Sequence, residues 1–305
     1  MVTRFQCPIR TVKKILSHHP FEVCYIQSNA CLFTFLTGNT IRRLPQSTML
    51  LNFLNLGCAT NTAYARLACA VLLSLSAATA HPGSRETYHS QSPLWLQAVG
   101  KLQVPGIKYS QGYPRNYRES CSATLIARSS NGVPTSAVAD TIVTAWHCLE
   151  FYNDLSKTIT FTLMYGTENS FSSEAVRVAD GGSMHADWAV LRLLQPVPGA
   201  AVSALAIHPD KANPLKPISM AGYSRNNPQQ RLSYDLNCSI TSALDKGSSA
   251  SNCSALKGSS GGAVMQRSSA GKPLLAGVIS QGDSQDLSLF VPVDAFRRAL
   301  NASLK

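Results

Sequence analysis

Charged side chains are scarce in this chain of 305 residues, where Asp, Glu, Lys and Arg together make up 14%. That share is about half of what soluble proteins usually carry, so a long coiled coil is disfavoured. Acidic residues are fewer than basic ones, with 16 Asp and Glu against 27 Lys and Arg. Glycine and proline follow no period, which excludes a collagen-like chain. The hydrophobic share of 45% is typical of a globular protein.

The excess of positive charge is thinly spread over most of the chain. Residues 1–80 carry seven Lys and Arg and one Glu, a net charge of +6, whereas residues 81–305 carry 20 basic and 15 acidic side chains, a net charge of +5. In the second part the only adjacent basic pair is Arg297-Arg298, which fits a solvated helix face. A nucleic-acid partner is therefore disfavoured.

Long apolar runs are missing as well. The apolar stretch over residues 67–80 is too short for a comfortable membrane span, which needs about 20 residues. It follows Arg66 and ends in Ala78-Thr79-Ala80, the pattern of a secretory signal peptide that is cleaved after Ala80. A buried helix or an uncleaved anchor is the alternative.

This pattern sets the expected organisation of the N-terminal part. A start at Met49 would give the signal an ordinary length, so residues 49–80 are predicted to be the signal peptide. Residues 1–48 are then an upstream extension of doubtful relevance, and the polar segment 81–94 is predicted to be mobile. We expect a secreted or periplasmic protein without a stable membrane anchor after cleavage.

Cysteine usage supports export, since five of the nine cysteines lie in residues 1–80 and four remain. An even number in an exported chain suggests disulfides, for which four cysteines allow three pairings. Proximity in the sequence favours Cys121–Cys148 and Cys238–Cys253. The spacing of the first three cysteines is not that of a zinc site, no H-E-x-x-H occurs, and the remaining histidines are dispersed. We therefore expect neither a metal nor a cofactor.

Short apolar or alternating runs, rich in β-branched residues and bounded by turn residues, recur after residue 95. This spacing predicts an all-β sandwich or barrel. The runs are Cys121–Arg128, Val138–Ala145, Thr158–Tyr165, Ala175–Ala179, Trp188–Leu194, Ile218–Tyr223, Leu232–Ile240, Ala263–Gln266, Leu274–Ser280 and Leu287–Val291. A closing amphipathic helix is predicted over 293–304, because apolar residues recur every three or four positions after Pro292.

Three short motifs contain residues suited to catalysis. His147 stands at the end of a strand-like run beside Cys148. Asp187 leads into an apolar strand, where a buried carboxylate needs a partner such as an imidazole N–H. Ser260 lies in the turn Gly258-Ser259-Ser260-Gly261-Gly262, ahead of another strand. Each motif alone also fits an ordinary structural role without catalysis: a half-buried histidine, a turn carboxylate or a flexible Gly-Ser loop.

Together the motifs resemble those of the chymotrypsin/trypsin-like serine peptidases. The blocks Thr-Ala-x-His-Cys, Asp-x-Ala-x-Leu and Gly-x-Ser-Gly-Gly occur in that family's order, which other triad folds do not share. The resemblance covers roughly residues 95–291. It implies a peptidase domain over 95–305, with two packed six-stranded antiparallel β-barrels at about 95–195 and 205–291 and a C-terminal helix.

The resemblance also implies roles for single residues. Ser260 would be the nucleophile, His147 the general base and Asp187 the carboxylate that orients it. The backbone N–H groups of Gly258 and Ser260 would form the oxyanion hole. Substrate would contact Ser254 and the strand edge at Ser280 and Gly282. A Cys121–Cys148 bridge is expected beside the catalytic histidine.

Departures from the digestive members place the chain closer to the bacterial-type, V8-like group. Ser259 replaces the aspartate that receives the new N-terminus in those zymogens, so trypsin-style activation is not expected. The stretch Ser254-Ala255-Leu256 lacks the aspartate of a Lys/Arg-specific pocket, and Ile279 replaces the histidine of Glu-specific members. A neutral pocket for small or apolar side chains remains, which Asp283 could upset.

The prediction is a secreted serine endopeptidase, monomeric, that acts on proteins or peptides. The alternative is a catalytically silent fold of the same type that serves as a binding or adhesion module.

Overall fold

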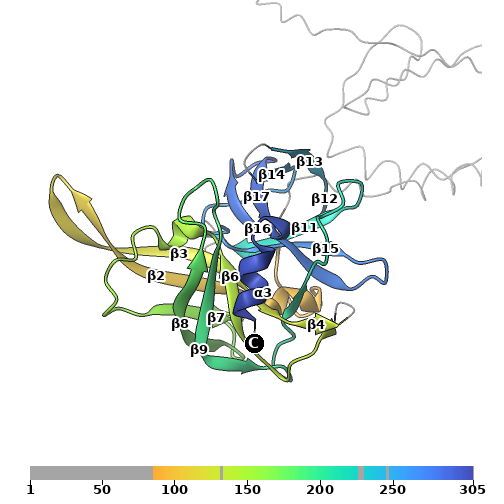
Figure 1. Ribbon diagram of the computed structural model, residues 1–305, viewed down its shortest axis with the longest axis horizontal. Helices are drawn as coiled ribbons and strands as arrows, with labels where there is room; N and C mark the ends of the chain where they lie inside the picture. Colours follow the sequence, from red (N-terminus) through yellow and green to blue (C-terminus); the bar gives the residue numbers. More distant parts are fainter. Residues whose placement is uncertain (1–84, 131–132, 226–229, 245–246, 305) are drawn as a thin grey trace, which may run out of the picture. The chain divides into compact units, whose positions relative to one another are not determined.

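The structure is a computed structural model that describes residues 85–130, 133–225, 230–244 and 247–304. The predicted extension (1–48), the predicted signal peptide (49–80) and residues 81–84 lie outside the described residues. In the described part, strands dominate and a single short α-helix stands near the end of the chain (Figure 1). No helix in these ranges is long and apolar enough to cross a membrane.

The first barrel is a closed ring of antiparallel strands, as predicted. Its strands follow one another in the order β2 (Val99–Ser110), β3 (Tyr113–Ala127), β6 (Val138–Thr144), β9 (Ala189–Pro198), β8 (Phe171–Asp180) and β7 (Ile159–Leu163). The pairing of β7 with β2 closes the ring. Fully buried side chains such as Leu102, Leu125 and Phe161 fill it, so apolar burial holds the barrel together.

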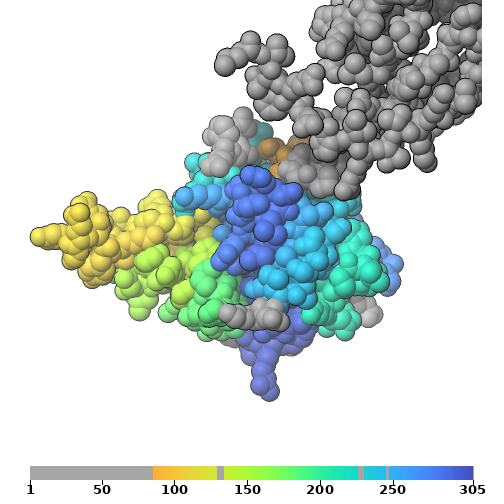
Figure 2. Space-filling model, turned by 90° about the horizontal axis from the view of Figure 1, so that it is seen from above, coloured from red at the N-terminus to blue at the C-terminus, as the bar shows by residue number. Residues whose placement is uncertain are grey.

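β2 and β3 continue beyond the barrel as a projecting hairpin (yellow in Figures 1 and 2). They pair from Val99 and Thr124 to Ser110 and Tyr113, whereas β7 pairs with β2 only over Gly100–Gln103. β2 was not predicted, because Gly100, Pro105 and Gly106 interrupt its apolar pattern. Pro105 is tolerated there because β7 no longer pairs with β2 at that position.

The second barrel is a row of antiparallel strands with one more short strand than predicted. The order is β12 (Leu232–Cys238), β11 (Ile218–Tyr223), β15 (Ala263–Arg267), β16 (Pro273–Gly282), β17 (Ser288–Pro292), β14 (Ser249–Ser251) and β13 (Ile240–Ala243). The predicted run 232–240 divides between β12 and β13 at Ser239, and Asn237, with a φ of +60°, lies where the pairing of β12 with β11 shifts register. A disulfide joins Cys238, the last residue of β12, to Cys253, which follows β14.

Three shorter strands complete the β-structure. β10 (Leu205–Ile207) runs parallel to β3 on one side and to β16 on the other, so it connects the barrels by hydrogen bonds. β4 (Ser129–Ser130) and β5 (Val133–Pro134) form a small separate hairpin. The ten predicted runs all fall on strands, which confirms the all-β prediction.

Part of the segment 81–94, predicted to be mobile, lies in the described residues, which start at Arg85. β1 (Glu86–Thr87) pairs with β12 at Tyr234 and Ser233, and a 3₁₀ turn, η1 (Leu94–Ala98), leads into β2. Although the segment is polar, Arg85 donates hydrogen bonds to the second barrel and fixes it there. Residues 85–92 therefore form an N-terminal arm on that barrel, whereas η1 packs on β2 and β3 of the first barrel.

The C-terminal helix is shorter than the predicted 293–304. A 3₁₀ turn, η3 (Val293–Ala295), precedes α3 (Arg297–Ser303), because Phe296 has a non-helical backbone with φ −131°. The predicted apolar positions Val293, Phe296, Leu300 and Leu304 are all buried. The spacing therefore identified the buried face correctly, although it overestimated the length of the helix.

Candidate active site

His147 is held by a short turn directly after β6. The turn η2 (Trp146–Leu149) follows the buried end of that strand, and a disulfide between Cys121 and Cys148 attaches it to β3, with a Cα–Cα distance of 6.2 Å. This is the pairing that the resemblance implied. The side chain of His147 keeps 23% of its exposure, so its ring is anchored but can still reach substrate.

Asp187 is the buried partner of His147. Its residue is only 1% exposed, and it lies just before β9, which pairs with β6. One carboxylate oxygen accepts the backbone N–H of His147 at 2.9 Å, and the other lies 2.9 Å from Nδ1 of the same ring. Ser280 donates its hydroxyl to that second oxygen. These three donors satisfy the hydrogen-bonding needs of a buried carboxylate, which in turn fixes the orientation of the imidazole.

The loop with Ser260 packs against the first barrel. A Cβ on Gly261 would lie 2.1 Å from the carbonyl oxygen of Ser122 and from Oγ1 of Thr144, so only glycine fits this contact. Gly261 also has a φ of +82°. The backbone N–H of Ser122 donates to the carbonyl of Ser260 at 2.8 Å. Ser260 is thereby placed between β3 and the turn that carries His147.

The hydroxyl of Ser260 does not bond to His147 in this arrangement. It donates to the backbone carbonyl of Ser280 at 3.3 Å, a long and weak contact. The structure thus brings His147, Asp187 and Ser280 into direct hydrogen bonds and places Ser260 on the adjoining loop. Transfer of its proton to the imidazole requires rotation of its side chain.

Two backbone amides in the same loop are available for a ligand. Among the described residues, neither the N–H of Gly258 nor that of Ser260 has an acceptor. Gly258 has a φ of +99°, and the peptide that carries its N–H is held by the N–H of Arg225, which donates to the carbonyl of Lys257 at 2.9 Å. Such paired N–H groups are suited to an oxyanion.

The predicted substrate-binding residues surround a narrow space. Ser254 is buried, Ser280 lies on β16, and Gly282 ends that strand. A Cβ on Gly282 would lie 2.5 Å from the carbonyl oxygen of Ala255, so the two walls nearly touch. Asp283 does not enter this space: its carboxylate accepts the N–H groups of the exposed turn that follows, which lower its pKa.

A buried charge pair supports the wall at Ser254. Arg85 donates to the carbonyl of Ser254 at 2.6 Å and to that of Gly222 at 3.2 Å. Asp235 accepts the N–H of Ser254 at 3.0 Å. Burial lowers the pKa of Arg85 to about 10, with Asp235 opposing the shift, and burial raises the pKa of Asp235. Both backbone groups of Ser254 are therefore held by charged side chains.

Sequence reasoning missed Arg85, Asp235 and Ser122. Arg85 lies in a polar segment that gives no sign of burial. Asp235 offered a signal, because it stands inside the strand-like run 232–240, where a buried carboxylate requires a partner. Ser122 joins the barrels through three hydrogen bonds, but a serine beside a cysteine carries no recognisable pattern.

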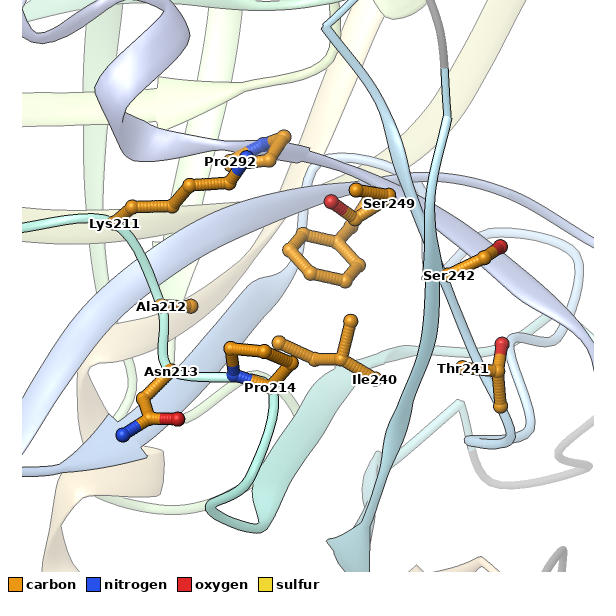
Figure 3. Close-up of a pocket in the computed structure, with 11 residues that line it drawn as sticks. Lys211, Ala212, Asn213, Pro214, Ile240, Thr241, Ser242, Ser249 and Pro292 are labelled. Atoms are coloured by element: carbon orange, nitrogen blue, oxygen red, sulfur yellow. The ribbon is translucent and has the colours of Figure 1, made fainter.

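One cavity lies apart from these residues (Figure 3). It has a volume of about 540 Å³ and lies between the segment 211–214, β13 and β17. Ile240, Pro214 and Phe290 make its lining mainly apolar, and none of the predicted site residues contributes to it. It therefore has no direct part in the chemistry of the site.

Comparisons with known proteins identify the family and the fold. Residues 121–272 match the family of the trypsin-like peptidase domain. Among solved structures, the chain is similar to the thermostable serine protease AL20 from an extremophilic microorganism, with a TM-score of 0.50 and 19% sequence identity. That alignment covers 69% of this chain and 98% of the other, and at this identity it shows the fold alone. No curated protein matches.

Proposed function

Since the chain belongs to the chymotrypsin/trypsin-like serine peptidase family, we propose that it is a secreted serine endopeptidase that uses His147, Asp187 and Ser260. The observation that carries the proposal is the buried Asp187, whose carboxylate accepts hydrogen bonds from the backbone N–H and from the ring of His147. A carboxylate with a structural role alone would not require a partly exposed imidazole, fixed by two hydrogen bonds, beside the loop that carries Ser260.

Catalysis begins with the rotation of the Ser260 hydroxyl away from the carbonyl of Ser280. His147 then accepts its proton at Nε2 while Oγ attacks the scissile carbonyl. Asp187 holds the proton on Nδ1 and stabilises the imidazolium that forms. His147 passes the proton to the leaving amine, and the acyl-enzyme is hydrolysed by the same steps with water as the nucleophile.

The developing negative charge on the carbonyl oxygen is stabilised by the N–H groups of Gly258 and Ser260. Their lack of an acceptor in the described residues supports this role. A donor of this kind typically contributes a factor of about 10²–10³ in turnover. The edge of β16 at Ser280 and Gly282 would pair with the acyl part of the substrate.

The narrow space between Gly282 and Ala255 supports a preference for small, uncharged side chains before the scissile bond. An aromatic ring needs a slot several ångströms wide, and these walls leave no such gap. The position of Asp283 in an exposed turn argues against a basic preference. A peptide-library profile dominated by Ala, Ser or Val at this position is expected.

Export is supported by the signal-like stretch at 67–80 and by the two disulfides, which form in oxidising compartments. We place the mature protein outside the cytoplasm, in the periplasm or beyond the cell. N-terminal sequencing of the exported product tests this, and a product that starts near His81 is expected.

The decisive experiment is labelling with a fluorophosphonate together with hydrolysis of casein. The wild type should react with the label and cleave casein, and Ser260→Ala should lose the label and about 10⁴–10⁶-fold in turnover. Ser259→Ala is the matched control, because it removes the neighbouring hydroxyl and leaves Ser260 in place. Full activity of Ser260→Ala would exclude the proposed mechanism.

The alternative, a catalytically silent binding module, predicts a folded wild type that neither reacts with the label nor cleaves casein. It would still require proteins or peptides as ligands.

A further inference from the structure

A second pocket, of about 370 Å³, lies beside the active-site loop. It lies on the face of β2 and β3 that turns toward the end of β11. We call it the basic pocket; its lining includes Lys101, Gln103, Arg118, Ser120, Arg225 and Gln230. Three of these side chains are cations, and no carboxylate contributes to the lining.

The basic pocket adjoins the loop that carries Gly258 and Ser260, and none of its lining residues belongs to the predicted acyl-binding edge at Ser280 and Gly282. A Cβ on Gly258 would lie 3.1 Å from the backbone nitrogen of Arg225 and 3.3 Å from its Cγ. Ser120 stands two residues before Ser122, whose N–H donates to the carbonyl of Ser260. An extended substrate that pairs with β16 before the scissile bond therefore continues past Gly258 toward this pocket.

Lys101 is the strongest sign that the pocket receives an anion. The residue is only 4% exposed, yet among the described residues no carboxylate pairs with it. Its ammonium contacts Oε1 of Gln230 and lies 3.9 Å from the centroid of the Tyr165 ring. These neutral contacts offset only part of the cost of burying a charge, which a carboxylate could offset further.

The other two cations differ in how far they are neutralised inside the protein. Arg225 forms an ion pair with Glu119. Arg118 is exposed and has no charged or hydrogen-bonded partner in the described part of the chain. Lys101 and Arg118 thus give the lining of the pocket two positive charges that no carboxylate of the described residues neutralises.

We infer that the basic pocket binds an acidic side chain of the substrate in the segment that follows the scissile bond, within the first three residues of the leaving group. This inference rests on the proposed peptidase function, and it adds a substrate class. The substrates are peptides with a small residue before the scissile bond and with Asp or Glu after it. Lys101 and Arg118 determine the preference.

The test compares internally quenched peptides that share one acyl part and carry Glu, Gln or Lys at the first, second or third position of the leaving group. At low salt, Glu at one of these positions should raise kcat/KM about tenfold over Gln, and added salt should reduce the difference. Lys101→Met and Arg118→Gln should each lower the ratio of Glu to Gln severalfold. Arg118→Glu should favour the Lys peptide.

Arg115→Gln is the matched control, because Arg115 is an exposed arginine on the same strand and does not line the pocket. An acyl p-nitroanilide, whose leaving group has no side chain, measures any general loss of activity in the pocket variants, and Arg115→Gln should cleave it as fast as the wild type. If the wild type cleaves the Glu and Gln peptides equally at every position, the inference is wrong although the peptidase function stands.

Peptide binding to the variant Ser260→Ala tests the basic pocket independently of the peptidase activity. Fluorescence anisotropy with leaving-group peptides that begin after the scissile bond should show tighter binding of the Glu than of the Gln peptide. If the wild type hydrolyses nothing and does not react with a fluorophosphonate, the peptidase proposal fails, and this binding preference alone decides about the pocket.

Discussion

At the scale of single residues, the carboxylate of Asp187 depends on three donors, two from His147 and one from Ser280. Ser280→Ala removes one of them and leaves the imidazole bonded. Because a hydrogen bond to a charged group contributes about 1.5–3 kcal/mol, we expect kcat to fall about 10–100-fold.

The separate effects of Ser280→Ala on kcat and on KM distinguish this positioning role from a general structural one. KM should stay close to that of the wild type, since the carbonyl of Ser280 still faces the substrate. Ser280→Thr retains a hydroxyl and should recover most of the activity. An equal loss in both variants, together with a raised KM, would contradict a positioning role for the side chain.

How much of the site the sequence reveals also depends on the individual residue. His147, Asp187 and Ser260 lie at strand ends within short blocks whose order is specific, so they could be named without a structure. Lys101 and Arg85 could not, because their burial comes from strands far away in the sequence. Arg85 contacts Ser233 and Ser254, which follow it by more than a hundred residues.

At the scale of secondary-structure elements, the N-terminal arm and β12 carry a buried charge pair whose effect on stability depends on pH. Burial raises the pKa of Asp235 above its ordinary value of 3.8. The native carboxyl therefore binds its proton more tightly than the unfolded one, and its contribution to stability is lost as pH rises through the native pKa. Arg85 remains ionised over this range.

Asp235→Asn abolishes this titration but keeps an oxygen for the N–H of Ser254. The free energy of unfolding of the wild type minus that of the variant should therefore fall with rising pH above 3.8, and level off once the native carboxyl is ionised. Urea denaturation of both proteins at steps between about pH 3.5 and pH 7 measures the difference. If the difference in unfolding free energy stays constant or rises with pH, burial does not raise the pKa of Asp235.

Element boundaries were predictable where one strand alternates between core and solvent, or lies wholly in the core. The run Ile218–Tyr223 coincides with β11, all of which is buried. β2 escaped prediction because its outer half pairs only with β3 and its sequence contains two glycines and a proline. β10 and β14 are too short for any period to be visible, and only pairing with distant strands makes them strands.

At the scale of the whole domain, the site exists only where the two barrels meet. β6, η2 and β9 of the first barrel position His147 and Asp187, whereas the loop before β15 and the strand β16 of the second carry Ser260 and Ser280. Ser122, β10 and the C-terminal segment connect the two halves. The relative placement of the barrels must therefore affect activity as well as stability.

The C-terminal segment offers the sharpest test of this coupling. Phe296 is 2% exposed and stacks on Trp188, the residue after Asp187, with a centroid distance of 5.3 Å. Phe296→Ala leaves a cavity and should lower the free energy of unfolding by about 3–5 kcal/mol. It should also lower kcat, because Trp188 loses the ring that fixes its position beside Asp187, the proposed member of the triad.

Phe296→Leu is the matched control, since it retains most of the volume and should cost less than about 1.5 kcal/mol. Urea denaturation gives the stability of both variants, and kcat/KM is measured below the onset of unfolding. If Phe296→Ala loses stability but retains full kcat while folded, the C-terminal segment supports the fold alone. A loss of kcat in Phe296→Ala that Phe296→Leu largely avoids is the result expected if packing at Trp188 holds Asp187 in place.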